Sequence, residues 1–238
     1  MCTVVVQVPA DPSHPVRLLA VRDEDPSRAW DPVGPWWPTT HPGVVGVRDR
    51  RAGGAWLAAD DDERRLAVIL NRADVLADDV PAESRGRIVL DAVAGVPPTG
   101  VPPTHGFNLV DVSGGRVRIS MWDAATLRTV RLAPGTHMIA HDDVDDPRTA
   151  RIRRWLDAFA AAAPELEARG DLRPWLDVLQ DTAATAATDD EAIIRDNRPS
   201  GIPTLSLLVC TASIRPDGID LEYGALDVPG EWNRPEMA

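Results

Sequence analysis

The residue with the clearest chemical potential in this sequence is Cys2. Because the cysteine side chain is small, we expect Met1 to be removed, which leaves a thiol and a free α-amine on one residue. The α-amine has a reference pKa of about 7.7 to 8.0, so it can take the thiol proton near neutral pH without a histidine. The thiolate then attacks a carbonyl carbon and forms an acyl-enzyme. A second-position cysteine also commonly has no function, and that alternative stays open at this point.

Two short apolar runs, residues 3–8 and 16–21, are predicted to form a β-hairpin. Both runs are rich in β-branched residues, and the segment PADPSHP between them consists of turn formers. The second strand therefore ends near the start of the first strand. This geometry brings a cation and a carboxylate, Arg22 and Asp23, to Cys2.

The register of the hairpin decides how the charged pair meets the thiol. A turn centred near residues 12 and 13 places Cys2 opposite Asp23 and Thr3 opposite Arg22. In that arrangement the Arg22 guanidinium lowers the pKa of the thiol from its usual value of about 8.5. The Asp23 carboxylate can orient the ammonium form of the α-amine.

An acyl transfer also needs donors for the oxyanion that develops on the attacked carbonyl, and a side-chain amide at the end of a strand is suitable. Asn71, which closes the run RLAVILN, and Asn108, in the run HGFNLV, are the candidates. Asparagines at strand ends are also common turn formers. Both interpretations remain open from the residues alone.

The composition excludes several classes of function. The formal net charge of −12 argues against nucleic-acid binding and against binding to anionic membranes, because both need clustered basic surface. The sequence contains no lysine. This excludes a Schiff-base lysine, a pyridoxal phosphate site and the phosphate-binding loop that needs Gly-Lys-Ser/Thr. The expected partner is a small molecule.

Cys2 and Cys210 are the two cysteines of the chain. They form neither a disulfide framework nor a tetrahedral zinc site, which fits a reducing cytoplasm. Cys210 lies within an apolar run and is expected to be an inert buried thiol. No signal peptide is recognisable, and no apolar run reaches the roughly 20 residues that cross a bilayer. We expect a soluble cytoplasmic protein without membrane insertion.

The apolar pattern predicts one domain over residues 1–238 with an α+β fold. Besides the hairpin, strands are expected at residues 54–59, 65–71, 107–112, 116–122, 126–132, 202–214 and 218–226. Helices are expected at residues 84–95, starting at a capping serine, and at 148–163 and 172–187. Residues 25–47 and 96–106 are predicted to be loops that form the wall of a pocket.

Four tryptophans are candidates for that wall. Trp30, Trp36 and Trp37 lie in the first loop, and Trp56 lies in a predicted strand. Most tryptophans pack into the core or under loops, which is the simpler explanation. The functional alternative is an apolar pocket over Cys2 that would accept an acyl chain, an aromatic group or a porphyrin.

His137 and His141 lie four residues apart, next to several aspartates, which invites a metal-site interpretation. The flanking residues are typical of loops, so a carboxylate-rich surface turn is favoured. We therefore expect no metal site here.

Several segments, taken together, resemble the NRDE family, whose members are similar to transport and Golgi organisation protein 2. The matching stretches run in family order from residue 1 to about residue 147. They are MCTVVVQV, AVRDED, SRAWDPVGPWWP, VVGVRDRRAGGAWLAAD, LAVILNRAD, ESRGRIVLD, HGFNLVDV and LAPGTHMIAHDDVDDP. RPSGIPTLSLLV is a looser match near the C-terminal strands.

This resemblance implies an N-terminal-nucleophile hydrolase fold, a four-layer αββα sandwich of two mostly antiparallel sheets flanked by helices. It is similar to the cysteine-type bile-salt hydrolase and penicillin V acylase group. By position, Cys2 matches the nucleophile, Arg22 and Asp23 match the adjacent Arg and Asp, and Asn71 falls near a strand-end Asn. The implied activity is cleavage of an amide or other acyl bond in a small, partly apolar molecule, with no cofactor required.

Two departures from the family pattern set up an alternative. Val21 stands where the family has the Asn of Asn-Arg-Asp-Glu, and His141, which we also place in the pocket, stands where the family usually has Asn. Family members are linked to haem trafficking and to lipid or acyl-coenzyme A handling. The alternative function is a non-catalytic carrier for haem or acyl-coenzyme A in the same cleft, and a degenerate domain kept for its surface is a third possibility.

Overall fold

The computed structural model describes residues 2–76 and 81–238, in which the chain forms two antiparallel sheets and three α-helices. The five-stranded sheet has the spatial order β10 (Gly135–Ile139), β1 (Thr3–Val8), β2 (Val16–Glu24), β11 (Leu205–Arg215) and β12 (Gly218–Ala225). The seven-stranded sheet runs in chain order: β3 (Trp30–Gly34), β4 (Val44–Asp49), β5 (Ala55–Asp60), β6 (Arg65–Asn71), β7 (Phe107–Ser113), β8 (Arg116–Trp122) and β9 (Leu127–Arg131). The helices are α1 (Gly86–Val93), α2 (Ala150–Arg169) and α3 (Arg173–Thr182).

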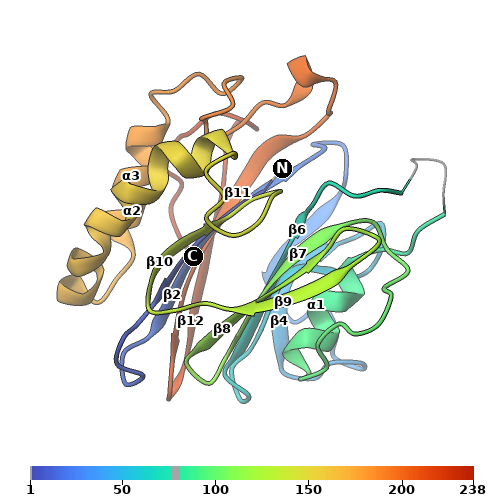
Figure 1. Ribbon diagram of the computed structural model, residues 1–238. Coiled ribbons are helices and arrows are strands. Elements are labelled where there is room, and N and C mark those ends of the chain that lie inside the picture. Colours follow the sequence, from blue (N-terminus) through green and yellow to red (C-terminus); the bar gives the residue numbers. More distant parts are fainter. Residues whose placement is uncertain (1, 77–80) are drawn as a thin grey trace.

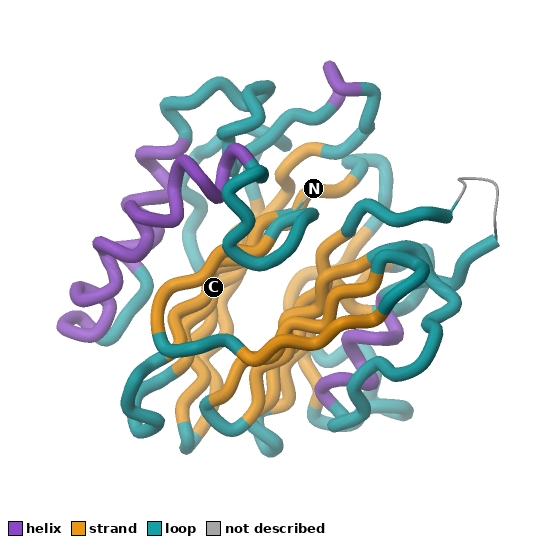
Figure 2. Tube along the Cα trace, in the orientation of Figure 1, coloured by secondary structure: helices purple, strands orange, loops and turns teal. Residues whose placement is uncertain are grey.

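The four layers follow from where the helices pack. The pair α2 and α3 covers the outer face of the five-stranded sheet, and α1 packs on β5 and β6 of the other sheet (Figure 1). Figure 2 shows the strands of both sheets as two adjacent layers, with helices on the outside. The predicted α+β fold, a sandwich of two antiparallel sheets flanked by helices, is confirmed.

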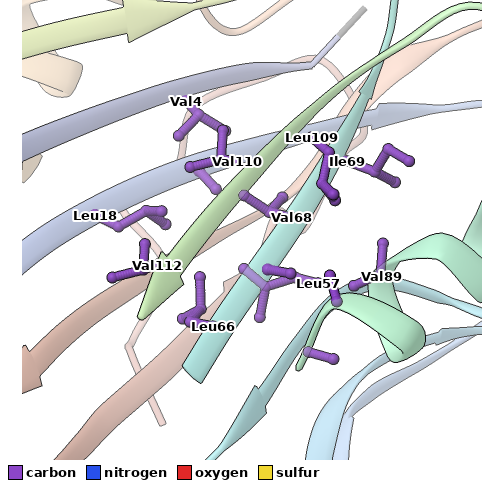
Figure 3. Close-up of a cluster of buried hydrophobic side chains, with 14 of the residues drawn as sticks. Val4, Leu18, Leu57, Leu66, Val68, Ile69, Val89, Leu109, Val110 and Val112 are labelled. Atoms are coloured by element: carbon purple, nitrogen blue, oxygen red, sulfur yellow. The ribbon is translucent and has the colours of Figure 1, made fainter. Parts of the chain in front are cut away.

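The side chains of β1, the second strand of the five-stranded sheet, alternate between the two cores. Val4 and Val6 point into the core between the sheets, whereas Val5 points into the core under α2 and α3. In Figure 3, Val4 lies beside Val110 of β7. A strand buried on both faces needs a nearly continuous apolar run, which is what the sequence of β1 provides.

The predicted register of the first hairpin is wrong by one residue. Thr3 pairs with Val21, not with Arg22. The cause lies in the turn, where Asp11 accepts hydrogen bonds from the backbone N–H groups of both Ser13 and His14 and centres the turn one half-residue earlier. Because a one-residue slip moves side chains to the opposite face, the thiol of Cys2 shares its face with Arg22 and not with Asp23.

Three further strands were not expected. β3 lies within residues 25–47, which were predicted to be a loop, and β4 begins within that segment and extends to Asp49. β10 lies in the segment with His137. β3 carries Pro32, which an edge strand tolerates, and its pairing with β4 is irregular. Each of these strands is short and lacks a clear apolar alternation, so the sequence pattern alone could not identify it.

The helices differ from prediction mainly at their ends. α2 continues through Pro164 to Arg169 because Leu166 is fully buried in the core under the helices. α3 ends at Thr182, earlier than expected. α1 begins at Gly86, and the Ser84 hydroxyl accepts a 3.3 Å hydrogen bond from the Gly86 N–H.

The C-terminal residues lie along β12, the edge strand of the five-stranded sheet. Ala238 and Tyr223 exchange two backbone hydrogen bonds of 3.0 Å each. The side chains of Pro235 and Met237 lie directly against the backbone of Gly224, where a Cβ atom would meet them at 2.8 and 3.0 Å. A glycine is therefore required for this close contact.

Candidate active site

Cys2 lies directly before β1 and faces a cavity of about 450 Å³ at one end of the sandwich. This cavity, the Cys2 cavity, is lined by Cys2, Arg22, Asp23, Glu24, Arg28, Asp49, Arg51, Ala52, Ala55, Trp56, Ile69, Asn71, Ala82, Glu83, Ser84, Arg85, Gly86 and His105. The thiol donates to the Asp23 carbonyl oxygen over 3.6 Å and accepts from the Asp23 N–H over 3.4 Å. Both contacts are with the backbone of Asp23. Met1, whose removal we expect, lies outside the described residues.

Arg22 is the cation next to the thiol. Its side chain is 3% exposed, and its Nη2 lies 3.4 Å from Glu24 Oε2. The Nη1 atom is buried and has no hydrogen-bond partner. A buried guanidinium N–H without an acceptor is costly, because its hydration is lost and not replaced. The arrangement supplies a donor that an acceptor on a bound molecule can satisfy.

Asp23 is held by the neighbouring strand β11. Ser206 donates a 2.6 Å hydrogen bond to Asp23 Oδ1 and accepts one of 2.8 Å from the Arg195 backbone N–H. At this point β11 has a register shift between Ser206 and Leu208, so that an additional residue lies opposite Arg22 and Asp23. Such bulges re-aim side chains locally. Here the bulge gives Asp23 a buried hydroxyl partner.

The pKa of the Cys2 thiol is raised, which differs from the expected lowering by Arg22. Burial is the main cause, and the Asp23 carboxylate adds to it. The Asp23 N–H and the Arg22 guanidinium act in the opposite direction and are weaker. The thiol is therefore protonated at neutral pH in this state, so a base must remove its proton when the thiol reacts.

The far wall of the cavity is formed by the start of α1 and the start of β5. Gly86 and Gly54 approach each other so closely that a Cβ on Gly86 would lie 2.9 Å from the Gly54 Cα. Next to them, Trp56 is buried and its indole Nε1 has no hydrogen-bond partner. Arg85 donates to the Gly106 carbonyl oxygen over 2.8 Å, which fixes its side chain at the cavity.

The two candidate oxyanion donors are placed differently. Asn71 has an exposed side chain and lines the Cys2 cavity. Asn108 is fully buried, and its amide nitrogen donates to the carbonyl oxygens of Ala140 and Asp142 over 2.9 and 2.7 Å. Both protons of the Asn108 amide are therefore used in tying β7 to the segment after β10.

Of the predicted pocket residues, Trp56 lines the Cys2 cavity. Trp37 donates its indole N–H to Gly53, and Trp36 lies beneath the Arg48 guanidinium, 4.9 Å from the ring centroid. Trp30 packs against the core between the sheets. None of these three side chains lines the Cys2 cavity.

His141 lines a second, smaller cavity at the start of α2. His137 lies on β10, where its Nδ1 is 2.6 Å from Asp145 Oδ2 and its Nε2 is 2.9 Å from the Ala133 carbonyl oxygen. In the part of the chain that the structure describes, no group of three or more His, Cys, Asp or Glu side chains is arranged to hold a metal ion. Cys210 is fully buried in β11, where burial raises the pKa of its thiol strongly.

Three features of the site were not predicted from the sequence: the Arg85 side chain, the Ser206 hydroxyl and the indole N–H of Trp56. Arg85 and Trp56 belong to segments that matched the family pattern, and this was the available signal. Ser206 could not be found from the sequence, because its role depends on the bulge in β11.

The layers and the cysteine directly before β1 define an α+β sandwich protein with a thiol at a cavity. The chain belongs to the Transport and Golgi organisation 2 family, whose model matches residues 1–216. The NRDE-type resemblance is thereby confirmed. A comparison with curated proteins gives no match. In the described residues, no helix is long and apolar enough to cross a membrane.

Proposed function

We propose that this protein is an N-terminal-nucleophile amidohydrolase that cleaves an amide or related acyl bond through Cys2 after Met1 is removed. The observation that carries the proposal is the position of the Cys2 thiol in a cavity whose wall contains two buried, unpartnered N–H donors, Arg22 Nη1 and Trp56 Nε1. A cavity with a nucleophile and unsatisfied donors is suited to a substrate with polar acceptors.

In the first half-reaction, the free α-amine of Cys2 takes the thiol proton as the sulfur attacks the carbonyl carbon. A C–S bond forms, and the carbonyl oxygen becomes an oxyanion that accepts hydrogen bonds from Asn71. The C–N bond then breaks, and the ammonium group gives its proton to the leaving nitrogen. The products are an amine and a thioester on Cys2.

In the second half-reaction, the same α-amine takes a proton from water, and the hydroxide attacks the thioester. The C–S bond breaks and the proton returns to sulfur, so that the carboxylic acid leaves and the thiol is restored. Asp23 positions the ammonium form through its Ser206-supported carboxylate, and Arg22 stabilises the thiolate. The raised thiol pKa explains why a local base is needed.

The test is mass spectrometry of the intact protein before and after treatment with a β-lactone or iodoacetamide. We expect loss of Met1 and a single β-lactone adduct that is absent in Cys2→Ala and present in Cys210→Ala. A protein that retains Met1, or that reacts at Cys2 no faster than at Cys210, would rule out this mechanism.

One observation favours a second candidate, a non-catalytic carrier in the same cleft. The Cys2 thiol is buried and its pKa is raised, which suits a group that is not reactive. The lining argues against haem as the cargo, because Arg22, Glu24 and Asp49 present charges where a porphyrin needs apolar walls. A haem titration followed by absorbance separates the cases: a Soret shift lost in Cys2→Ala supports the haem carrier, and an unsaturable titration removes it.

A further inference from the structure

A second cavity of about 160 Å³ lies at the start of α2 and shares no lining residue with the Cys2 cavity. Three arginines and a histidine line it: Arg148, Arg151, Arg195 and His141. Its one carboxylate is Asp190, which is 85% exposed and pairs with Arg195. Arg148 is paired with Asp146 and Arg195 with Asp190, so Arg151 is the lining arginine for which no ion pair is described. We call this second cavity the α2 cavity.

Arg151 is the central residue of the α2 cavity. Its side chain is 1% exposed, its Nη2 contacts His141 Nδ1 at 3.2 Å, and its Nε is buried without a hydrogen-bond partner. Burial lowers the pKa of this guanidinium to about 10, so it stays charged at neutral pH. A charged guanidinium buried in this way is normally matched by an anion. The Asp23 and Asp190 carboxylates supply part of that charge, and the Nε of Arg151 still has no acceptor.

The α2 helix begins at the same cavity. The N-cap residue Thr149 makes no capping hydrogen bond with its side chain, because its hydroxyl donates to Asp142 Oδ2 over 2.7 Å. The first turn of this 20-residue helix contains no acidic residue. The first turn therefore supplies no carboxylate to the helix dipole, and the Asp142 carboxylate reaches this end of the helix through the Thr149 hydroxyl.

The other basic side chains are fixed in place. Arg195 is buried, and its Nε and Nη1 donate to Asn197 Oδ1 and to the Asp189 carbonyl oxygen over 2.8 and 3.0 Å. His141 accepts the Arg151 hydrogen bond at Nδ1, and its Nε2 lies 3.5 Å from Asp142 Oδ2. The guanidinium groups are thus held in position before any ligand arrives, which reduces the entropy lost on binding.

We propose that the α2 cavity binds a phosphate group, with Arg151 and Arg195 as its charged ligands and the first turn of α2 as its backbone donor. A tetrahedral oxyanion satisfies the unpartnered Nε of Arg151 and the helix N-terminus together. The volume exceeds the roughly 30 Å³ that one water molecule occupies in the liquid by about fivefold, so a group of several heavy atoms fits. The proposal does not require a reaction at Cys2, although the charges of Asp23 and Cys2 act on Arg151.

The test is isothermal titration calorimetry of the whole protein with inorganic phosphate, against sodium chloride of equal ionic strength. We expect saturable binding to one site. Glycerol 3-phosphate serves as a phosphate monoester: tighter binding of the monoester assigns the site to a phosphorylated molecule, and equal or weaker binding assigns it to the free ion. Phosphate binding that does not saturate would overturn the proposal.

Four variants locate the site. Ala150→Glu places a carboxylate in the first turn and should weaken phosphate binding at least 10-fold, as should Arg151→Met. Asp190→Asn removes the one carboxylate of the lining and should strengthen binding several-fold. The matched control is Arg153→Gln, which removes an exposed arginine of the same helix outside the cavity.

The buried Arg151→Met variant needs a check of its folding by circular dichroism, and Ala150→Glu keeps the proposal testable if that variant does not fold. Binding that survives Ala150→Glu, or that falls equally in Arg153→Gln, would show that phosphate binds elsewhere or through overall charge. Neither result would affect the proposed reaction at Cys2.

Discussion

The Ser206 hydroxyl donates a 2.6 Å hydrogen bond to the Asp23 carboxylate, joining two residues 183 positions apart in the chain. The same hydroxyl accepts the Arg195 backbone N–H, so it connects β2, β11 and the segment that leads into β11. Through this bond the orientation of Asp23 depends on the bulge in β11. Ser206 therefore supports the site indirectly, by holding the carboxylate of Asp23.

Replacing Ser206 with alanine is expected to lower the free energy of unfolding by about 1–3 kcal/mol, because two buried partners lose their hydrogen bond. The Cys2 acylation rate should fall as well, since Asp23 loses its support. Urea unfolding and β-lactone labelling measure the two effects. The matched control is Ser213→Ala, another buried serine of β11. Equal losses in both variants would contradict the specific role of Ser206.

Replacement of Asn108 should change mainly the stability of the protein, and replacement of Asn71 should change mainly the rate of acylation at Cys2. Asn108→Ala leaves the buried Ala140 carbonyl without its partner and should lower the free energy of unfolding by about 1–3 kcal/mol. Asn71→Ala changes an exposed side chain, so stability should stay within about 0.5 kcal/mol. Under the proposed function, acylation of Cys2 should slow about 100-fold in Asn71→Ala.

These effects are checked by urea unfolding and by timed mass spectrometry with the β-lactone. A fully active Asn71→Ala variant would remove this residue from the oxyanion site.

Trp56→Phe removes an indole N–H that has no partner in the folded protein. Because no hydrogen bond is lost, we expect the thermal midpoint to stay close to that of the unchanged protein. Acylation should nevertheless slow if the indole binds the substrate. Phe is smaller than Trp, so Trp56→Leu provides a control for volume. A strong loss of stability in Trp56→Phe would indicate that packing, and not the free N–H, is the main role of this side chain.

Gly86→Ala tests the close approach of α1 to β5. Alanine favours a helix over glycine by about 1 kcal/mol, but its Cβ would lie 2.9 Å from Gly54 Cα. Because the atoms that this Cβ would meet belong to the backbone, the contact cannot relax easily, and we expect a net destabilisation of about 1–3 kcal/mol. Arg87→Ala, at a neighbouring position that is 82% exposed, is the control. A stabilised Gly86→Ala variant would show that α1 can move away.

The pH dependence of stability should contain a contribution from His137. Its hydrogen bond to Asp145 raises the pKa of the imidazole, against the opposing effect of burial. A raised pKa in the folded state means that this stabilisation is complete below the unfolded pKa of about 6.5 and is lost as the pH rises through the folded value.

The difference in unfolding free energy between the unchanged protein and His137→Gln should therefore be larger near about pH 5.5 than near about pH 8.5. Urea unfolding at both pH values measures it, and His14→Gln, an exposed histidine, controls for loss of a histidine in general. A difference that does not change with pH would assign the role of His137 to packing.

The parts of this structure that sequence reasoning could predict are those with strong local signals. The hairpin of β1 and β2 follows from two apolar runs and a turn of Pro, Asp and Ser, and it brings Arg22 and Asp23 to Cys2. The register differs from the prediction by one residue because it depends on Asp11, whose carboxylate accepts the Ser13 N–H and whose backbone carbonyl oxygen accepts the His14 N–H. That single slip decided which charged side chain shares a face with the thiol.

The composition of the cavity wall could not be predicted because it depends on tertiary structure. Trp30, Trp36 and Trp37 looked like pocket residues on the assumption of a long loop, but two strands form there and none of the three side chains lines the Cys2 cavity. Trp56 lines the cavity because the close approach of Gly54 and Gly86 places the start of α1 beside it. Contacts of this kind join segments that are not neighbours in the sequence.

The C-terminal tail along β12 has a consequence for the behaviour of the protein at high concentration. The unpaired backbone of an edge strand is a template for joining a second molecule, strand to strand. Here Ala238 already occupies the hydrogen-bonding positions of Tyr223, and the glycine at 224 lets Pro235 and Met237 close over the backbone. The tail therefore blocks strand-to-strand pairing with a second molecule at this edge. Pro235 in the tail has no backbone N–H, which disfavours further pairing along the tail itself.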